Sequence, residues 1–393
     1  MTMNKLVRKN ISRMHYVLML ISLSTGYFLC HILTLYFSIF PCRKNKKGDI
    51  IFFPFTQPGS DGFERRIRQY LPLFERDNTI YKVCSIYNDS IIQKIMGGND
   101  IGRYRLFRKI FWIRFSQVLC AARYKSVFIQ RGLFPLYPDQ KSPHLEKLLY
   151  CINKNVTIDF WDSVWVYNSD LVDKTIKYCR QISCVNKFVY DHFKQSNKNK
   201  KIFPIGVDLK KYKIKTDYQT TNPVRLFYTG NPANVEEFLG VVNPVLNEIS
   251  EKTKIILVLV TRQKLDTGKI RSEFHEFSED TFFDLLAGSD IGLYAVEDSE
   301  ISKGKMAMKV LDYLSAGLPA VASPYGILPG AENEKNLLIA NDKEEWISAI
   351  TRLCNDFELR KKLGTEGRKT AEREHNLEES YMQFRKMLLE TNA

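Results

Sequence analysis

The stretch that decides the fold is Ile301–Gly326, ISKGKMAMKVLDYLSAGLPAVASPYG. Its pattern predicts a loop, an amphipathic helix that begins at Gly304 and Lys305, a Gly-Leu-Pro stop and a short apolar strand. The first N–H groups of a helix and the positive end of its dipole attract anions, and a lysine there strengthens the site. Asp312 follows two turns later, roughly on the same helix face. From the residues alone, an anion-binding helix and an ordinary core-packed helix remain alternatives.

Length and composition set the broad class of protein. The chain has 393 residues, of which 44% are hydrophobic, which is enough for two or three domains with sizeable cores. A formal charge of +14 predicts an anionic partner, which is a nucleic acid, an acidic membrane surface or a phosphorylated small molecule. We find no nucleic-acid-binding motif and expect no nucleic acid partner. Eight cysteines without a CxxC pair indicate reduced thiols, and the isolated histidines indicate no metal site.

The amino-terminal segment is the second strong signal. The 27 residues from Met14 to Phe40 contain no Asp, Glu, Lys or Arg. A helix of that length exceeds the roughly 30 Å of a bilayer's hydrocarbon core, so we expect a membrane anchor in residues 1–47 with a span at about 14–40. Basic residues flank both ends and leave the orientation open. A helix that lies in the membrane interface, or that packs on the globular part, is the alternative.

The remainder alternates between strands and helices, which predicts parallel sheets in two α/β domains. The boundaries are an amino-terminal domain at 48–208, a linker at 209–222, a carboxyl-terminal domain at 223–370, and a helix in 371–393 that packs back on the first domain. A helix is expected from Phe63 to about Glu75, and Asn197–Lys201 is expected to be a polar loop. The predicted strands are 49–55, 83–87, 126–130, 155–160, 224–228, 254–261, 290–295 and 320–322.

With these elements in place, the run SDIGLYAVEDSEISKGKMAMKVLDYLSAGLPAVASPYG at 289–326 resembles the group 1 glycosyltransferases, glycosyltransferase family 4. The resemblance extends over about residues 48–390 and is closest to bacterial surface-polysaccharide members. It implies the GT-B fold, in which two Rossmann-like α/β domains face each other across a cleft. Weaker matches are FPFTQPGSDGFERRIR at 53–68, VFIQRG at 127–132, TIDFWDSVW at 157–165 and FPIGVD at 203–208.

By the same resemblance, the carboxyl-terminal domain binds a nucleotide-diphosphate sugar. Lys305 would contact the donor diphosphate, and Asp312, where the family usually has glutamate, would contact the ribose. Gly304 occupies a position that is often a second glutamate. Gly230 and Asn231 would lie close to the donor phosphates. The resemblance also implies retention of anomeric configuration, and no Asp-x-Asp motif is in place, so we expect no metal and no other cofactor.

Candidates for the acceptor side lie in the first domain. Asp159 and Asp162 come at a strand end and are the candidate catalytic residues, able to orient or deprotonate an acceptor hydroxyl. The alternatives are that Asp159 caps the following turn and that Asp162 is a solvated loop residue. Arg65, Arg66 and Arg131 are candidates to bind the diphosphate of a lipid-linked acceptor, unless they are surface charges.

The apolar segment, the positive charge and the resemblance together predict the partners and the place of action. We expect a nucleotide-diphosphate sugar donor, a glycan or polyprenyl-linked acceptor, and attachment to the inner (plasma) membrane with the globular part in the cytoplasm. A non-catalytic protein of the same fold and a nucleotide-sugar epimerase are the alternatives.

Overall fold

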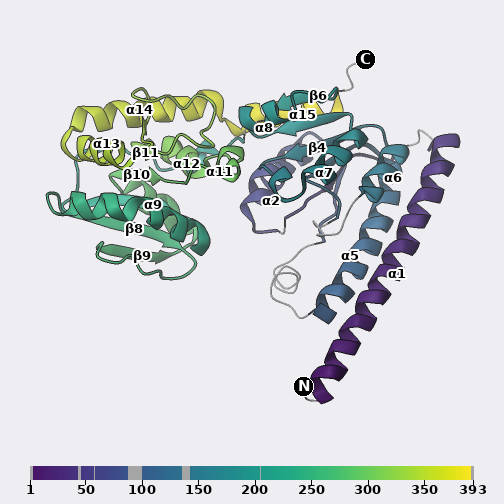
Figure 1. The fold of residues 1–393 in the computed structure, drawn as a ribbon. Coiled ribbons are helices and arrows are strands. Elements are labelled where there is room, and N and C mark those ends of the chain that lie inside the picture. Colours follow the sequence, from purple (N-terminus) through teal and green to yellow (C-terminus); the bar gives the residue numbers. More distant parts are fainter. Residues whose placement is uncertain are drawn as a thin grey trace. The chain divides into compact units, whose positions relative to one another are not determined.

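The computed structural model describes residues 3–42, 46–56, 58–86, 100–134, 142–203 and 205–390, with the backbone alone for residues 3–11 and 100. The chain forms two compact units, Met1–Phe203 with Tyr381–Ala393, and Pro204–Ser380. Each contains a six-stranded sheet (Figure 1) in which all the neighbouring strands are parallel. The predicted α/β class with two Rossmann-like units is confirmed.

The sheet of the first unit has the strand order β2-β1-β3-β4-β5-β6. Its strands are β1 Gly48–Phe53, β2 Tyr81–Val83, β3 Tyr124–Gln130, β4 Val156–Phe160, β5 Gln181–Cys184 and β6 Asn199–Ile202. Its helices are α1 Met3–Ile39, α2 Asp61–Arg66, α3 Leu71–Arg76, α5 Asp100–Cys120, α6 His144–Ile152, α7 Trp165–Thr175 and α8 Lys187–His192, with short 3₁₀ turns at Arg68–Tyr70, Ala121–Arg123 and Ile176–Tyr178.

The sheet of the second unit has the strand order β12-β11-β10-β7-β8-β9. Its strands are β7 Val224–Thr229, β8 Ile255–Thr261, β9 Ser272–Glu276, β10 Ile291–Tyr294, β11 Ala320–Ala322 and β12 Leu338–Ile339. Its helices are α9 Pro232–Ser250, α10 Glu279–Ala287, α11 Glu300–Gly304, α12 Met308–Ala316, α13 Lys343–Asn355 and α14 Phe357–Glu374, with a 3₁₀ turn at Leu209–Lys211. The last helix of the chain is α15 Leu377–Leu389.

In both sheets the strand order reverses direction at one place, between β1 and β3 and between β7 and β10. Ligands of open parallel sheets bind outside the carboxyl ends of the strands at such a reversal. The loops that follow β1, β3, β7 and β10 are therefore the places to look for functional side chains.

Two local predictions for the first unit are wrong. The helix expected from Phe63 to Glu75 is divided into α2, a 3₁₀ turn and α3, and the backbone leaves helical geometry at Ile67. Pro72 lies in the first turn of α3, where it lacks an N–H for a continuous helix. The polar loop expected at Asn197–Lys201 overlaps the strand β6, which lies at the edge of the sheet, where lysines are common in strands.

The segment expected to be a linker packs on the second unit. Tyr212 and Tyr218 are buried, and the ammonium group of buried Lys215 donates a hydrogen bond to the carbonyl of Ser289 (2.8 Å). At the other end of the chain, α15 joins the first unit, since the ring of Phe384 stacks on that of Phe203 at 4.7 Å.

The amino-terminal helix α1 packs lengthwise on α5 and α6 (Figure 1). A Cβ on Gly26 would lie 2.0 Å from the ring of Phe111, so α1 and α5 approach closely there. Trp112 donates a hydrogen bond to the hydroxyl of Ser22 (2.9 Å). The opposite face of α1 is exposed and apolar, and Ser12–Ile39 is long and apolar enough to cross a membrane. Its exposed residues include Val17, Leu18, Ile21, Phe28, Ile32, Leu35, Tyr36 and Ile39.

Candidate active site

At the carboxyl end of β7 the chain turns into α9 through Gly230 and Asn231. The side chain of Asn231 caps α9 by accepting a hydrogen bond from the backbone N–H of Asn234 (2.9 Å). A Cβ on Gly230 would lie 3.3 Å from the Cβ of Asn234 and 3.4 Å from the Cε of Lys309. The space above Gly230 is therefore bounded by a helix amino-terminus and a lysine, which is an arrangement that suits an anion.

The helix expected to begin at Gly304 and Lys305 begins later, so that prediction is wrong. Gly304 ends the short helix α11, Lys305 is extended (φ −75°, ψ 163°), and α12 starts at Met308. The cause is a contact with the loop after β11. Gly326 has a φ of +66°, and a Cβ on it would lie 2.6 Å from the carbonyl oxygen of Lys305. This close approach holds the chain out of the helix, and the local sequence pattern does not reveal it.

Lys309, which the sequence analysis missed, is the lysine in the first turn of α12. Its ammonium group lies 5.2 Å from the ring centroid of Tyr228, within reach of a cation–π contact. Tyr228 is buried, stacks on Phe238 at 3.7 Å and donates a hydrogen bond from its hydroxyl to the carbonyl of Asn234 (2.9 Å). These contacts place the Lys309 side chain beside Gly230. The available signal was its position, one helical turn after Lys305.

Asp312 follows Lys309 by three residues, so both side chains lie on neighbouring parts of one face of α12. Asp312 is only 4% exposed, and its carboxylate accepts a hydrogen bond from the hydroxyl of Tyr212 (2.5 Å). Tyr212 comes from the segment expected to be a linker, and its ring packs edge-on against Phe283 at 5.0 Å. The role of Asp312 toward a ribose stays a prediction, and Tyr212 is a second residue that the sequence analysis missed.

The sequence of the second unit matches a known family model. Residues 223–356 match the model described as glycosyl transferases group 1. The second unit is a group 1 glycosyltransferase domain. The predicted family and enzyme class, a glycosyltransferase, are therefore confirmed. No curated protein sequence matches the chain.

Solved structures of glycosyltransferases share the fold over most of the chain. HepE from Anabaena, crystallised with UDP and glucose, is 12% identical with a TM-score of 0.60, over 86% of this chain and 98% of its own. Sucrose-phosphate synthase from Thermosynechococcus elongatus is 12% identical with a TM-score of 0.60, over 86% of this chain and 97% of its own. A glycosyltransferase from Rickettsia africae is 12% identical with a TM-score of 0.60, over 87% and 99%. At these identities the likeness shows the GT-B fold.

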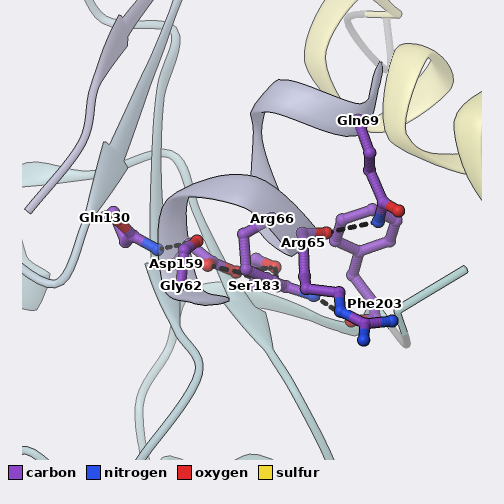
Figure 2. Close-up of polar contacts among 8 residues, drawn as sticks. All are labelled: Gly62, Arg65, Arg66, Gln69, Gln130, Asp159, Ser183 and Phe203. Carbon is purple, nitrogen blue, oxygen red and sulfur yellow. Dashed lines mark hydrogen bonds and ion pairs between the residues drawn. The ribbon is translucent and has the colours of Figure 1, made fainter. Parts of the chain in front are cut away.

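In the first unit, two of the predicted acceptor-side residues form an internal ion pair (Figure 2). Arg66 and Asp159 have no exposed surface. The guanidinium of Arg66 donates to both carboxylate oxygens of Asp159, with Nε at 3.0 Å from Oδ2, and to the carbonyl of Phe203 (2.6 Å). Ser183 also donates to Asp159 (2.6 Å). These contacts are those of a structural pair, and the acceptor and catalytic roles predicted for Arg66 and Asp159 stay untested predictions.

The other two predicted residues form a second, more accessible ion pair. Arg131 donates to Asp162, and their side chains are 20% and 21% exposed. The guanidinium of Arg131 lies over the rings of Phe55 (5.1 Å) and Trp161 (5.8 Å). Arg65 is partly exposed on α2, one residue before the buried arginine. The structure thus separates the predicted set into a buried pair, an accessible pair and a peripheral arginine.

Metal ligands were not expected. Among the residues that the structure describes, no three or more His, Cys, Asp or Glu side chains are grouped as they would be to hold a metal ion. Metal independence stays a prediction.

Proposed function

We propose that the chain transfers a sugar from a nucleoside diphosphate sugar to a hydroxyl of a glycan or polyprenyl-linked acceptor, in bacterial surface-polysaccharide or glycoconjugate synthesis. The observation that supports binding of the nucleotide sugar donor is the position of Lys309 beside Gly230, next to the amino-terminus of α9. The Anabaena HepE structure, with UDP and glucose bound, supports the same donor class for this chain.

The donor chemistry follows from this geometry. As the glycosidic bond breaks, negative charge develops on the departing diphosphate. Lys309 and the positive dipole ends of α9 and α12 supply fixed positive charge near that place, which is how a preorganised site lowers a transition-state barrier. The proposal includes independence of metal ions, since the lysine and the helix ends take the place of a divalent cation. It also includes retention of the anomeric configuration, which rests on the family resemblance alone.

The first expected result concerns donor binding. In a thermal-shift screen against UDP, GDP and ADP sugars, one nucleotide class should raise the Tm of the full chain. A ligand at one hundred times its Kd adds about 2.7 kcal/mol of apparent stability. Turnover of the same sugar should release the nucleoside diphosphate and persist in EDTA. Conversion of the nucleotide sugar to its epimer would favour the epimerase alternative, and the absence of any shift would favour a non-catalytic protein.

The proposal also places the chain at the inner membrane through α1, with the globular part in the cytoplasm. One face of α1 packs on α5 and α6, and the face opposite is apolar and exposed. The neighbouring helix α5 carries Arg105, whose guanidinium lies 3.1 Å from the ring nitrogen of His15. A span through the bilayer would draw α5 and its further basic residues toward the hydrocarbon, where each charged side chain costs about 2.5–3.5 kcal/mol or more at the centre. Attachment in the interface, with arginines and lysines near anionic head groups, avoids that cost.

We therefore expect the purified chain to sediment with preformed phosphatidylglycerol vesicles and to be released by alkaline carbonate. The double variant Ile21→Glu/Leu35→Glu should weaken this binding more than tenfold, because both side chains lie on the exposed face, at 58% and 63% exposure. Ile214→Glu, at an apolar residue of the second unit that is 52% exposed, is the matched control and should bind normally. Resistance of the chain to carbonate would indicate a span instead.

A further inference from the structure

A small cavity lies at the carboxyl edge of the first sheet, near the reversal between β1 and β3. Its volume is about 30 Å³, which is room for two groups the size of a water molecule or hydroxyl. Arg131 and Glu146 line its polar part, Phe55 and Phe134 its aromatic part, and residues of α7 complete the apolar wall. None of the reaction steps described above uses this cavity.

Glu146, on α6, has a carboxyl group in which one oxygen accepts a hydrogen bond from the described residues and the other does not. The side chain is 3% exposed, and its Oε1 accepts a hydrogen bond from the backbone N–H of Leu133 (2.8 Å). Its Oε2 has no hydrogen-bond partner among the residues described. Buried polar atoms in folded proteins are nearly always paired, so this oxygen at a cavity indicates a donor group that the protein itself does not supply.

Arg131, which also lines the cavity, has an unusual backbone. Its φ is +62°, in the left-handed region that residues other than glycine seldom adopt and that is concentrated at functional sites. Its backbone N–H donates to the carbonyl of Asp159 (2.9 Å), which holds the residue in this conformation at the end of β3. The Nε–H of its guanidinium has no hydrogen-bond partner within the described part of the chain. The cavity walls therefore include one donor and one acceptor that remain to be satisfied.

We propose that this cavity binds two neighbouring hydroxyl groups of an uncharged sugar, with Glu146 accepting a hydrogen bond from one and Arg131 donating to the other. A diol offers both a donor and an acceptor, and it fits the volume, whereas a phosphate would meet the carboxyl group of Glu146. The aromatic rings of Phe55 and Trp161 lie beside the guanidinium of Arg131, where the C–H face of a sugar ring can pack. The inference rests on the proposed glycosyltransferase function and names the acceptor group as a sugar.

The position of Glu146 also relates the cavity to the amino-terminal helix. The helix α6 that carries it packs on α1, where the ring of His144 stacks on that of Tyr27 at 4.2 Å. One helix that contributes to the cavity thus packs on the helix whose outer face we assign to the membrane. A sugar carried on a lipid would reach it from the membrane surface, and a free sugar would reach it from solution.

The test uses the full chain and two sets of probes, which are methyl glycosides of glucose, galactose, mannose and N-acetylglucosamine in solution, and the same sugars as octyl glycosides in phosphatidylglycerol vesicles. Binding is followed by ligand-observed NMR titration. At least one sugar should bind, and tighter binding of its octyl form would identify the lipid-borne source. Glu146→Gln should weaken that binding about tenfold or more, because the amide presents a donor where the carboxyl presents an acceptor.

Two further variants keep the result interpretable. Asp173→Asn, an exposed carboxylate on α7, is the matched control and should bind the sugar normally. Arg131→Gly removes the guanidinium at a backbone conformation that glycine favours, so it should fold and bind the sugar more weakly. Glu146→Gln should also fold, because burial raises the pKa of Glu146 and the amide removes the cost of ionising it at neutral pH.

The nucleotide-induced change in Tm separates this inference from the proposed function. Glu146→Gln should leave that change intact, since the nucleotide site lies in the second unit. Failure of every glycoside to bind the wild-type chain, or equal binding by Glu146→Gln, would overturn the inference even if nucleotide binding is present. Failure of every nucleotide to shift the Tm would instead count against the proposed function.

Discussion

Replacing Arg66 with methionine should destabilise the first unit by about 3–5 kcal/mol, which corresponds to a fall in Tm on the order of 10 °C. The guanidinium of Arg66 engages both carboxylate oxygens of Asp159, and neither side chain is exposed. Without it, Asp159 keeps the hydroxyl of Ser183, and the carbonyl of Phe203 loses its donor. The loss of stability arises because the buried carboxylate of Asp159 is left without a positive partner. Thermal unfolding followed by circular dichroism measures it.

The matched control is Arg65→Met, which removes the neighbouring, partly exposed arginine of α2. Its free energy of unfolding should change by less than about 0.5 kcal/mol. The double variant Arg66→Met/Asp159→Leu removes both charges and should recover much of the lost stability, since apolar replacement of a buried ion pair is often tolerated. A double variant that is stable but inactive would support the predicted catalytic role of Asp159. An unchanged Tm for Arg66→Met would contradict the structural role.

The central strands of both sheets were predictable from the sequence. Parallel strands covered on both faces are continuous apolar runs, and β8, with the sequence IILVLVT, is entirely buried. The strand β11 was predicted with the bounds that the structure has, because a Gly-Leu-Pro stop precedes it. These signals are local, and local signals were sufficient.

The side-chain partners were not predictable, because they join distant parts of the chain. Arg66 and Asp159 are 93 residues apart in sequence, and the pattern around each one equally suits an exposed charge. The hydrogen bond between Tyr212 and Asp312 joins residues 100 apart. The cavity beside Arg131 depends on Glu146, which follows no motif and lies on a helix that was not predicted. When a binding site is assembled from several loops, the sequence pattern of each single loop does not reveal it.

The start of α12 shows how such a distant contact changes a functional assignment. The amphipathic pattern was correct for α12, but the contact between Gly326 and Lys305 moves the helix start from Gly304 to Met308. Because the helix starts about one turn later, its first turn contains Lys309 and not Lys305. The two lysines therefore make different predictions for one experiment.

Lys309→Gln should lower kcat/KM for the nucleotide sugar about a hundredfold or more, because removing one preorganised charge contact from a transition state costs about 2.7–4 kcal/mol. Lys305→Gln, four residues earlier, is the matched control and should lower kcat/KM less than about threefold, since its position follows α11 and precedes the first turn of α12. Steady-state release of the nucleoside diphosphate measures both. Each variant should keep the Tm of the wild-type chain within a few degrees, because neither side chain is buried.

Binding of the nucleoside diphosphate and of the nucleoside alone separates a phosphate contact from a general disturbance of the site. Lys309→Gln should weaken the diphosphate and leave the nucleoside unchanged, because the ammonium group lies beside Gly230, where the phosphates are expected. Equal weakening of both ligands would mean that Lys309 acts by supporting Tyr228 and the turn into α9. A larger loss for Lys305→Gln than for Lys309→Gln would return the diphosphate contact to the lysine that the sequence pattern indicated, and would require Lys305 to reach the site from outside the helix.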